Sequence, residues 1–175
     1  MNHYKSWSAL NKQLSACLCE LLKDRITYFL TRYHKVHNSY GRVSIRLDGE
    51  ELVNFSWVEM YHQDEDIHAL WETTGIWTDQ AQELKDKWDA EGEYSDYDFL
   101  SAATEFLQLS IKDALNSENY IIRIFAIMDK RVGRRTLEKI WKEKDYQKYP
   151  RWIRQFYELR LEKYQSFGEE YEETG

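Results

Sequence analysis

Two strand patterns joined by Asp-Gly constrain this chain more than any other feature of its sequence. Residues 42–47 alternate polar and apolar side chains, and residues 52–61 place Val53, Phe55 and Trp57 at every second position. Alternation of this kind is typical of strands with one buried face. Asp-Gly between two such strands is a strong signal for a hairpin. The sequence therefore predicts an antiparallel hairpin that turns near Asp48-Gly49.

The apolar positions of the two strands also predict how they pair. A two-residue loop would place Val43 opposite Asn54, an apolar side chain against a polar one. A three-residue loop, residues 48–50, instead pairs Val43 with Phe55. Since a slip of one residue turns a whole strand face over, we predict the three-residue loop. The expected buried face is Val43, Ile45, Val53 and Phe55, and the expected outward face is Arg42, Ser44 and Arg46.

Apolar side chains spaced three and four residues apart predict helices in most of the remaining chain. Ser95 and Asp98 have the spacing of a capping box, so a helix is expected to begin there, and Pro150 is well placed at the start of the last helix. β-branched and aromatic residues at 25–34 predict a further strand. The expected helices are 7–22, 95–115, 121–132 (with a strand as the alternative), 136–144 and 150–167, with short helical patterns between 64 and 88.

These elements together predict an α+β fold: a small antiparallel sheet of about three strands covered by several helices. One domain is expected over residues 1–167, followed by a disordered acidic tail at 168–175. The net charge of −7 is unevenly distributed. Residues 59–118 carry 3 basic and 16 acidic side chains, whereas residues 119–165 carry 13 basic and 6 acidic ones. The two segments either neutralise each other within the fold or form separate binding surfaces.

The sequence predicts a cytoplasmic protein that makes no membrane contact. No stretch approaches the roughly 18 apolar residues of a membrane span, and no targeting segment is recognisable. Cys17 and Cys19 are the only cysteines, and two residues apart on a helix they are poorly placed to form a disulfide. We therefore expect reduced thiols, at least one of them buried and inert.

Motifs for metal binding and catalysis are weak. His34 and His37 lack the glutamate and the helical frame of a zinc-binding helix motif. His62 and Asp64 belong to an acidic cluster that more simply marks a solvated helix start. Nucleophile elbows, phosphate-binding loops and dinucleotide fingerprints are absent from the sequence. We predict no cofactor, no metal and no catalytic residue.

The basic segment that begins at Asp129 is the strongest candidate for binding. Basic side chains with aromatic neighbours suit phosphate neutralisation and base stacking, but arginines here also suit ion pairs with the acidic stretch 59–98. The second interpretation is favoured because nucleic-acid-binding domains are usually basic overall, and this chain has a pI near 5.3. The candidate binding residues are Arg131, Arg134, Arg135, Lys139 and Lys142.

Two motifs carry a resemblance to a known family. They are Trp7-x-x-Leu10-x-x-x-Leu14 near the start and Asp129-Lys130-Arg131-Val132-Gly133-Arg134-Arg135-x-Leu137 near the end. With the early strands, they make the chain similar, along its whole length, to a family of small uncharacterised bacterial proteins. That family has no assigned activity, so the resemblance implies a bacterial cytosolic protein and no mechanism.

The functional hypothesis is a non-enzymatic module that binds another protein through charged and aromatic surface. In composition, the acidic segment 59–98 is compatible with a toxin immunity factor. The alternative is a nucleic-acid-associated protein that uses the basic residues between 130 and 154. A hydrolase or metal enzyme built from the histidines is the weakest of the three hypotheses.

Overall fold

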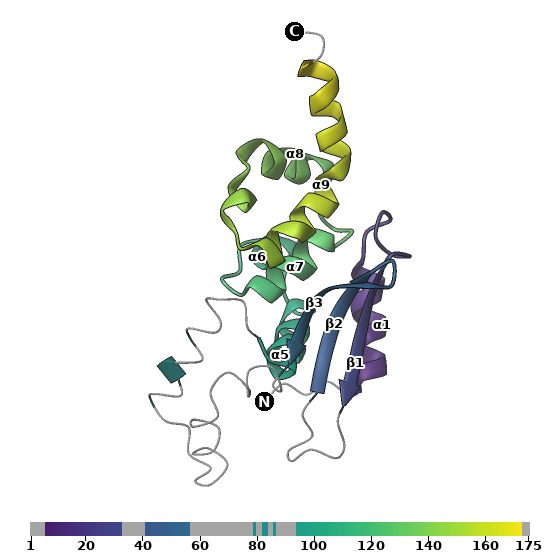
Figure 1. Ribbon diagram of the computed structural model, residues 1–175, viewed down its shortest axis with the longest axis vertical. Coiled ribbons are helices and arrows are strands. Elements are labelled where there is room, and N and C mark those ends of the chain that lie inside the picture. Colours follow the sequence, from purple (N-terminus) through teal and green to yellow (C-terminus); the bar gives the residue numbers. More distant parts are fainter. Residues whose placement is uncertain are drawn as a thin grey trace. The chain divides into compact units, whose positions relative to one another are not determined.

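The computed structural model describes residues 6–32, 41–56, 79, 82–83, 86 and 94–172, with side chains up to residue 164. It contains a three-stranded sheet in the order β1-β2-β3, together with helices, and the predicted α+β class is confirmed (Figure 1). The elements are α1 (Trp7–Cys17), β1 (Ile26–Arg32), β2 (Gly41–Leu47), β3 (Glu50–Ser56), α5 (Asp96–Phe106), α6 (Ile111–Leu115), α7 (Tyr120–Met128), α8 (Arg134–Glu143), the 3₁₀ helix η2 (Asp145–Lys148) and α9 (Arg151–Glu172).

The chain divides into two compact units, and each is described by itself. One unit is built from residues 1–27 together with 102–175, and the other from residues 28–101. The first unit is thus discontinuous in sequence. The short helical patterns between 64 and 88 lie almost entirely outside the described residues. Residues 57–61, the end of the predicted second strand, also lie outside them. The expectation of one domain with a disordered tail stays a prediction.

The hairpin has the predicted pairs but not the predicted loop. Val43 pairs with Phe55 and Ile45 with Val53, as expected. The turn, however, contains only two residues, Asp48 and Gly49, which both have positive φ angles of 52° and 88°. Such angles define the tight turn that suits the twist of a hairpin. The pairing then shifts by one residue between Ile45 and Arg46, so a β-bulge supplies the extra residue that we had assigned to the loop.

The turn glycine gives a first testable prediction. Gly49 has a φ of 88°, where a side chain is strained although the surrounding space is open. We expect Gly49→Ala to lower the free energy of unfolding by about 1–2 kcal/mol, because a Cβ atom disfavours the left-handed region. Glu50→Ala is the control, since Glu50 is the exposed neighbour of Gly49 in the same hairpin and does not have a positive φ. Urea denaturation measures both, and equal losses of stability would contradict the explanation.

One outward position of the sheet is buried, contrary to the prediction. Val43, Ile45 and Phe55 are 0% exposed, as expected, and Val53 is partly buried. Ser44 was expected to face solvent but is only 1% exposed. Arg46 explains the difference: its Nε donates to Ser44 Oγ at 3.3 Å, and its guanidinium lies 4.5 Å from the centre of the Phe29 ring. A long side chain lying along the sheet therefore covers the short one.

The predicted helix over 95–115 is two helices. The capping box at its start is confirmed, because the Ser95 hydroxyl accepts from the Asp98 N–H at 3.2 Å and Asp98 Oδ2 accepts from the Ser95 N–H at 2.8 Å. The helix α5 ends at Phe106, and α6 begins after Ser110. Ser110 repeats the spacing with Asp113, whose N–H it accepts at 3.1 Å. This second cap ends the continuous helix that apolar periodicity alone had indicated.

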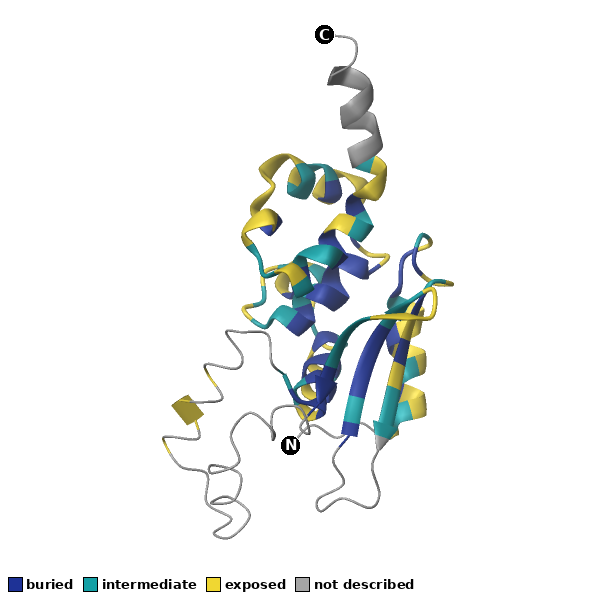
Figure 2. Cartoon of the chain, in the orientation of Figure 1, coloured by how far each residue is buried: buried dark blue, intermediate teal, exposed yellow. Residues whose placement is uncertain are grey.

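The helix α7 is the most buried element of the first unit. Seven of its residues are buried, and Figure 2 shows it mostly in the colour of buried residues. Phe125 of this helix packs on Phe106 with ring centres 5.4 Å apart, and Phe156 and Leu161 of α9 are 0% exposed. The helical interpretation of residues 121–132 is thus confirmed as far as Met128. The helices α8 and α9 are also where expected, although α9 continues to Glu172 instead of ending near 167.

Candidate functional site

The loop between α7 and α8 is tied to the residues that follow α1. The N–H of Cys19 donates to Met128 O at 2.9 Å, and the N–H of Lys130 donates to Cys17 O at 2.8 Å. The two segments form an isolated antiparallel bridge between Leu18 and Asp129. This pairing ends α1 at Cys17, whereas the apolar spacing had predicted a helix to residue 22. It also fixes where the basic segment begins.

Asp129 organises the loop from inside the protein. It is 1% exposed, and its Oδ1 accepts the backbone N–H of Arg131 at 2.7 Å. Its Oδ2 accepts from Nη2 of the same arginine at 2.9 Å. Because a buried carboxylate is costly unless it is paired and hydrogen-bonded, Arg131 completes a structural site. The hydrogen bonds that the Arg131 guanidinium donates to Asp129 also raise the pKa of this guanidinium.

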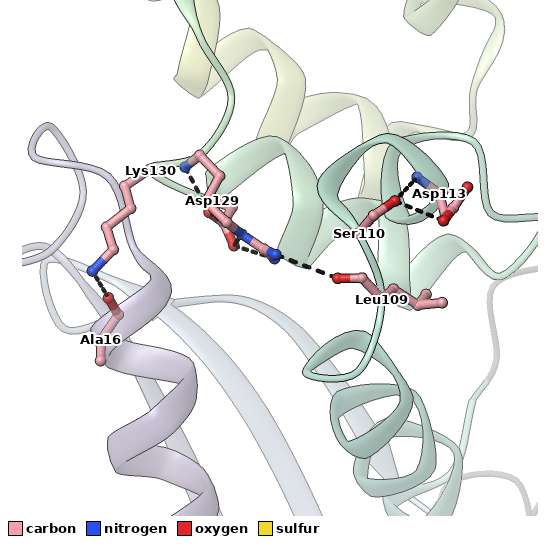
Figure 3. Close-up of polar contacts among 7 residues, drawn as sticks. Ala16, Leu109, Ser110, Asp113, Asp129 and Lys130 are labelled. Carbon is pink, nitrogen blue, oxygen red and sulfur yellow. Dashed lines mark hydrogen bonds and ion pairs between the residues drawn. The ribbon is translucent and has the colours of Figure 1, made fainter.

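The cationic side chains of the loop reach in two directions. Lys130 Nζ donates to Ala16 O at 2.7 Å (Figure 3), which places a positive charge at the C-terminal end of α1, where the helix dipole favours it. Arg131 Nη1 donates to Leu109 O at 3.3 Å, and the guanidinium lies 5.6 Å from the centre of the Phe106 ring. The loop is therefore held both to α1 and to the α5–α6 connection.

The other four predicted binding residues lie on α8. Arg135, Lys139 and Lys142 follow at intervals of four and three residues, which places them on one helical face, and all three are exposed. Arg134 pairs with Glu138 at 2.7 Å and Lys139 with Glu143 at 3.7 Å, each one helical turn further along. These pairs are exposed, so they contribute little to stability. The structure thus presents four of the five predicted residues to solvent on one helix.

The predicted ion pairs between the arginines and the acidic stretch stay a prediction. We had favoured ion pairs with the acidic stretch 59–98, most of which lies outside the described residues. The described ion pairs of Arg131 and Arg134 are local, with Asp129 and Glu138. The Arg131 side chain is 42% exposed but pairs with a fully buried carboxylate, whereas the Arg134 side chain is 86% exposed and pairs with a partly exposed one. The basic segment therefore has a structural part in the loop and a surface part on α8.

A hollow of about 410 Å³ opens beside α8. Its apolar side includes Val132 and Ile140, and Tyr146 and Tyr157 contribute buried rings that stack 5.7 Å apart. Burial raises the pKa of Tyr157 above its usual range, so this hydroxyl stays neutral at physiological pH. Both cations and carboxylates reach the hollow, from Lys112, Arg131, Lys139, Glu143 and Asp145. The neighbourhood of α8 is therefore amphipathic and of mixed charge.

Metal and thiol chemistry receive no support from the part of the chain that the structure describes. Within those residues, no three side chains of His, Cys, Asp or Glu come together as a metal site. His34, His37, His62 and Asp64 lie outside the described residues. Cys19 is buried, and burial, followed by the charge of Asp129, raises the pKa of Cys17. A raised pKa leaves this thiol protonated and poorly nucleophilic. Over the same residues, no helix has the length and apolar character needed to cross a membrane.

Sequence reasoning missed the anchoring roles of Asp129 and Lys130. An acid two residues before an arginine is a visible signal for the local pair. The bridge to residues 17–19 leaves no comparable trace, because it joins segments about 110 residues apart. The site residues that the sequence did predict were found from composition alone, without information on which of them reach solvent.

The fold and the site define an α+β protein with an exposed helix, α8, that carries both basic and acidic side chains. Among the described residues, we identify no catalytic site. This chain belongs to the SF0329 protein family, whose family model matches residues 6–161. The match extends from α1 into α9 and confirms the expected membership of an uncharacterised family. Neither the curated proteins nor the solved structures contain a match to this chain.

Proposed function

We propose that this protein is a non-enzymatic binding module that docks an acidic segment of another protein on the exposed face of α8. The observation that carries the proposal is the row formed by Arg135, Lys139 and Lys142 on one exposed helical face. Figure 2 shows exposed residues along much of this helix. Complementary charge of this kind steers association and fixes the orientation of a partner.

The face is also firmly supported, which favours recognition by a preformed surface. Leu137 of α8 is buried, and the loop before the helix is anchored by Asp129 and Lys130. At its other end, Lys144 adopts a left-handed conformation with a φ of 55°, which turns the chain into η2. A preformed surface avoids the entropic cost of ordering on binding.

The charges around α8 favour a protein partner over nucleic acid. Glu138 and Glu143 alternate with the basic residues on the helix, and Asp145 follows directly. A continuous phosphate backbone would lie against these carboxylates and be repelled by them. An acidic protein segment can instead place its carboxylates opposite the basic residues of α8 and its uncharged side chains opposite the acidic ones. The net charge of −7 also opposes non-specific attraction to nucleic acid. A cytoplasmic setting belongs to the same proposal and is supported by the two thiols, and a bacterial origin is proposed from the family resemblance alone.

Charge reversal on the α8 face tests the proposal. We expect Arg135→Glu, Lys139→Glu and Lys142→Glu together to weaken binding of the native partner by about 100-fold or more, because attraction becomes repulsion at the interface. The partner is first identified by co-purification from the native cell and then titrated in pure form by calorimetry. Melting curves are expected to change little, since all three side chains are exposed.

The matched control reverses three exposed bases elsewhere, Lys12, Lys23 and Arg151. It is expected to retain partner binding, because the same change in net charge falls outside α8. If the control loses as much affinity as the α8 variant, the assignment of the binding face is wrong. If nuclease treatment removes the partner and the wild type binds oligonucleotides in a salt-sensitive way, the protein belongs to the nucleic-acid-binding class instead.

A further inference from the structure

A second hollow, of about 400 Å³, lies beside the α7–α8 loop. Its apolar walls come from Leu18 and Leu21, which follow α1, and from Leu137 of α8. All of its lining residues belong to the unit built from residues 1–27 and 102–175. The volume falls within the lower range of small-molecule sites.

The charged groups around this hollow are mainly positive. Lys130, from the loop, and Arg160 and Lys163, from α9, all line it. The carboxylate among the lining residues is that of Glu20, which forms an ion pair with Lys23 at 2.7 Å. The first hollow, of about 410 Å³, differs in charge, because carboxylates line it together with the cations. The charge balance of this second site therefore favours an anionic ligand.

Arg160 brings a further hydrogen-bond donor without a described acceptor to this part of the unit. Its Nε is buried, and no hydrogen-bond acceptor for it is found among the described residues. A buried donor without a partner costs free energy, and the guanidinium of Arg160 has further N–H groups that can donate to a ligand in the hollow. Lys130 also has donors to spare, because its ammonium carries three and Ala16 O uses one.

We propose that this hollow binds a small organic phosphate, with the phosphate group held by Lys130, Arg160 and Lys163. Three cations suit a dianion better than a single carboxylate. The hollow is larger than a phosphate group alone requires, and its leucine walls accommodate an apolar body attached to that phosphate. This site is separate from the α8 face, and the proposal does not depend on the proposed protein partner.

Calorimetric titration of the full chain with three probes tests the ligand class. Phenyl phosphate carries both the dianion and an apolar body, inorganic phosphate carries the anion alone, and phenol carries the body alone. We expect phenyl phosphate to bind saturably in the millimolar range or tighter and at least about fivefold more tightly than inorganic phosphate, with phenol much weaker than either. Absence of saturable binding of phenyl phosphate below about 10 mM would overturn the proposal. Equal affinity for phenyl phosphate and inorganic phosphate would overturn the organic part of the ligand, and equal affinity for phenol would overturn the anionic part.

Substitutions test the location of the site. Arg160→Gln and Lys163→Gln are each expected to weaken phenyl phosphate binding by about tenfold, because each removes one charge-assisted contact. Arg135→Gln on α8 is the control and is expected to retain the binding of phenyl phosphate. Lys163 is exposed, so its variant tests the site even if Arg160→Gln is unstable. Undiminished binding in Lys163→Gln, or equal losses in Arg135→Gln and Lys163→Gln, would refute the location. A loss of protein-partner binding in Arg135→Gln concerns the α8 face alone.

Discussion

Replacing Arg131 with alanine is expected to lower the free energy of unfolding by about 2–3 kcal/mol. The substitution leaves the Asp129 carboxylate buried without its cation, and a buried charge deprived of its partner typically costs about 3–5 kcal/mol. We expect less than this because the Arg131 side chain is 42% exposed, so solvent already screens the pair. Urea denaturation of the purified variant measures the change.

A second substitution in the same pair provides the internal control. Asp129→Ala removes the buried charge, so adding it to Arg131→Ala is expected to restore part of the lost stability. The double variant is then less destabilised than the sum of the single variants. Arg134→Ala, which disrupts an exposed pair, is expected to leave the unfolding curve nearly unchanged. Strict additivity of the two changes in the pair would show that Asp129 and Arg131 do not stabilise the loop together.

Truncation of Ile45 is expected to be at least as costly, at about 2–5 kcal/mol. Ile45 is 0% exposed in the centre of β2, so Ile45→Ala removes buried apolar surface and leaves a cavity that the sheet only partly closes. Glu50→Ala, at an exposed position of the same hairpin, is the control and is expected to have a small effect. Thermal and urea denaturation measure both variants. A loss below about 1 kcal/mol for Ile45→Ala would show that the core does not depend on this strand.

Local patterns predicted most elements of the fold, and failures occurred where tertiary contacts or a second local signal intervened. The strand pairs followed from alternation, because each strand has one face that must be buried. The bulge near Leu52 was assigned to the loop, since an extra residue shifts the pairing by one at either place. The break between α5 and α6 was visible in Ser110 and Asp113, a capping pair that apolar spacing had outweighed in our interpretation. Ser44 was misplaced because its burial depends on a neighbouring side chain, Arg46, whose path the sequence does not specify.

The candidate site was predictable as a set of charges but not as an arrangement. Arg131, Arg134 and Arg135 look equivalent in sequence, and charge counting treated them as one patch. The structure separates them, because Arg131 balances a buried carboxylate whereas Arg134 is largely exposed. Reversing all three together would therefore mix a loss of stability with a loss of binding. The hollow near Arg160 was not predictable, since its walls come from three segments distant in sequence.

The bridge between residues 17–19 and 128–130 has a consequence for the order in which the chain is synthesised. The segment after α1 emerges from the ribosome long before its pairing partner, with the whole of the second unit in between. Until residue 130 has left the exit tunnel, the carbonyl of Cys17 and the N–H of Cys19 lack their partners. Closing so long a loop is slow compared with local helix formation. Nascent chains halted before residue 128 therefore hold the end of α1 without the pairing that fixes it in the folded protein.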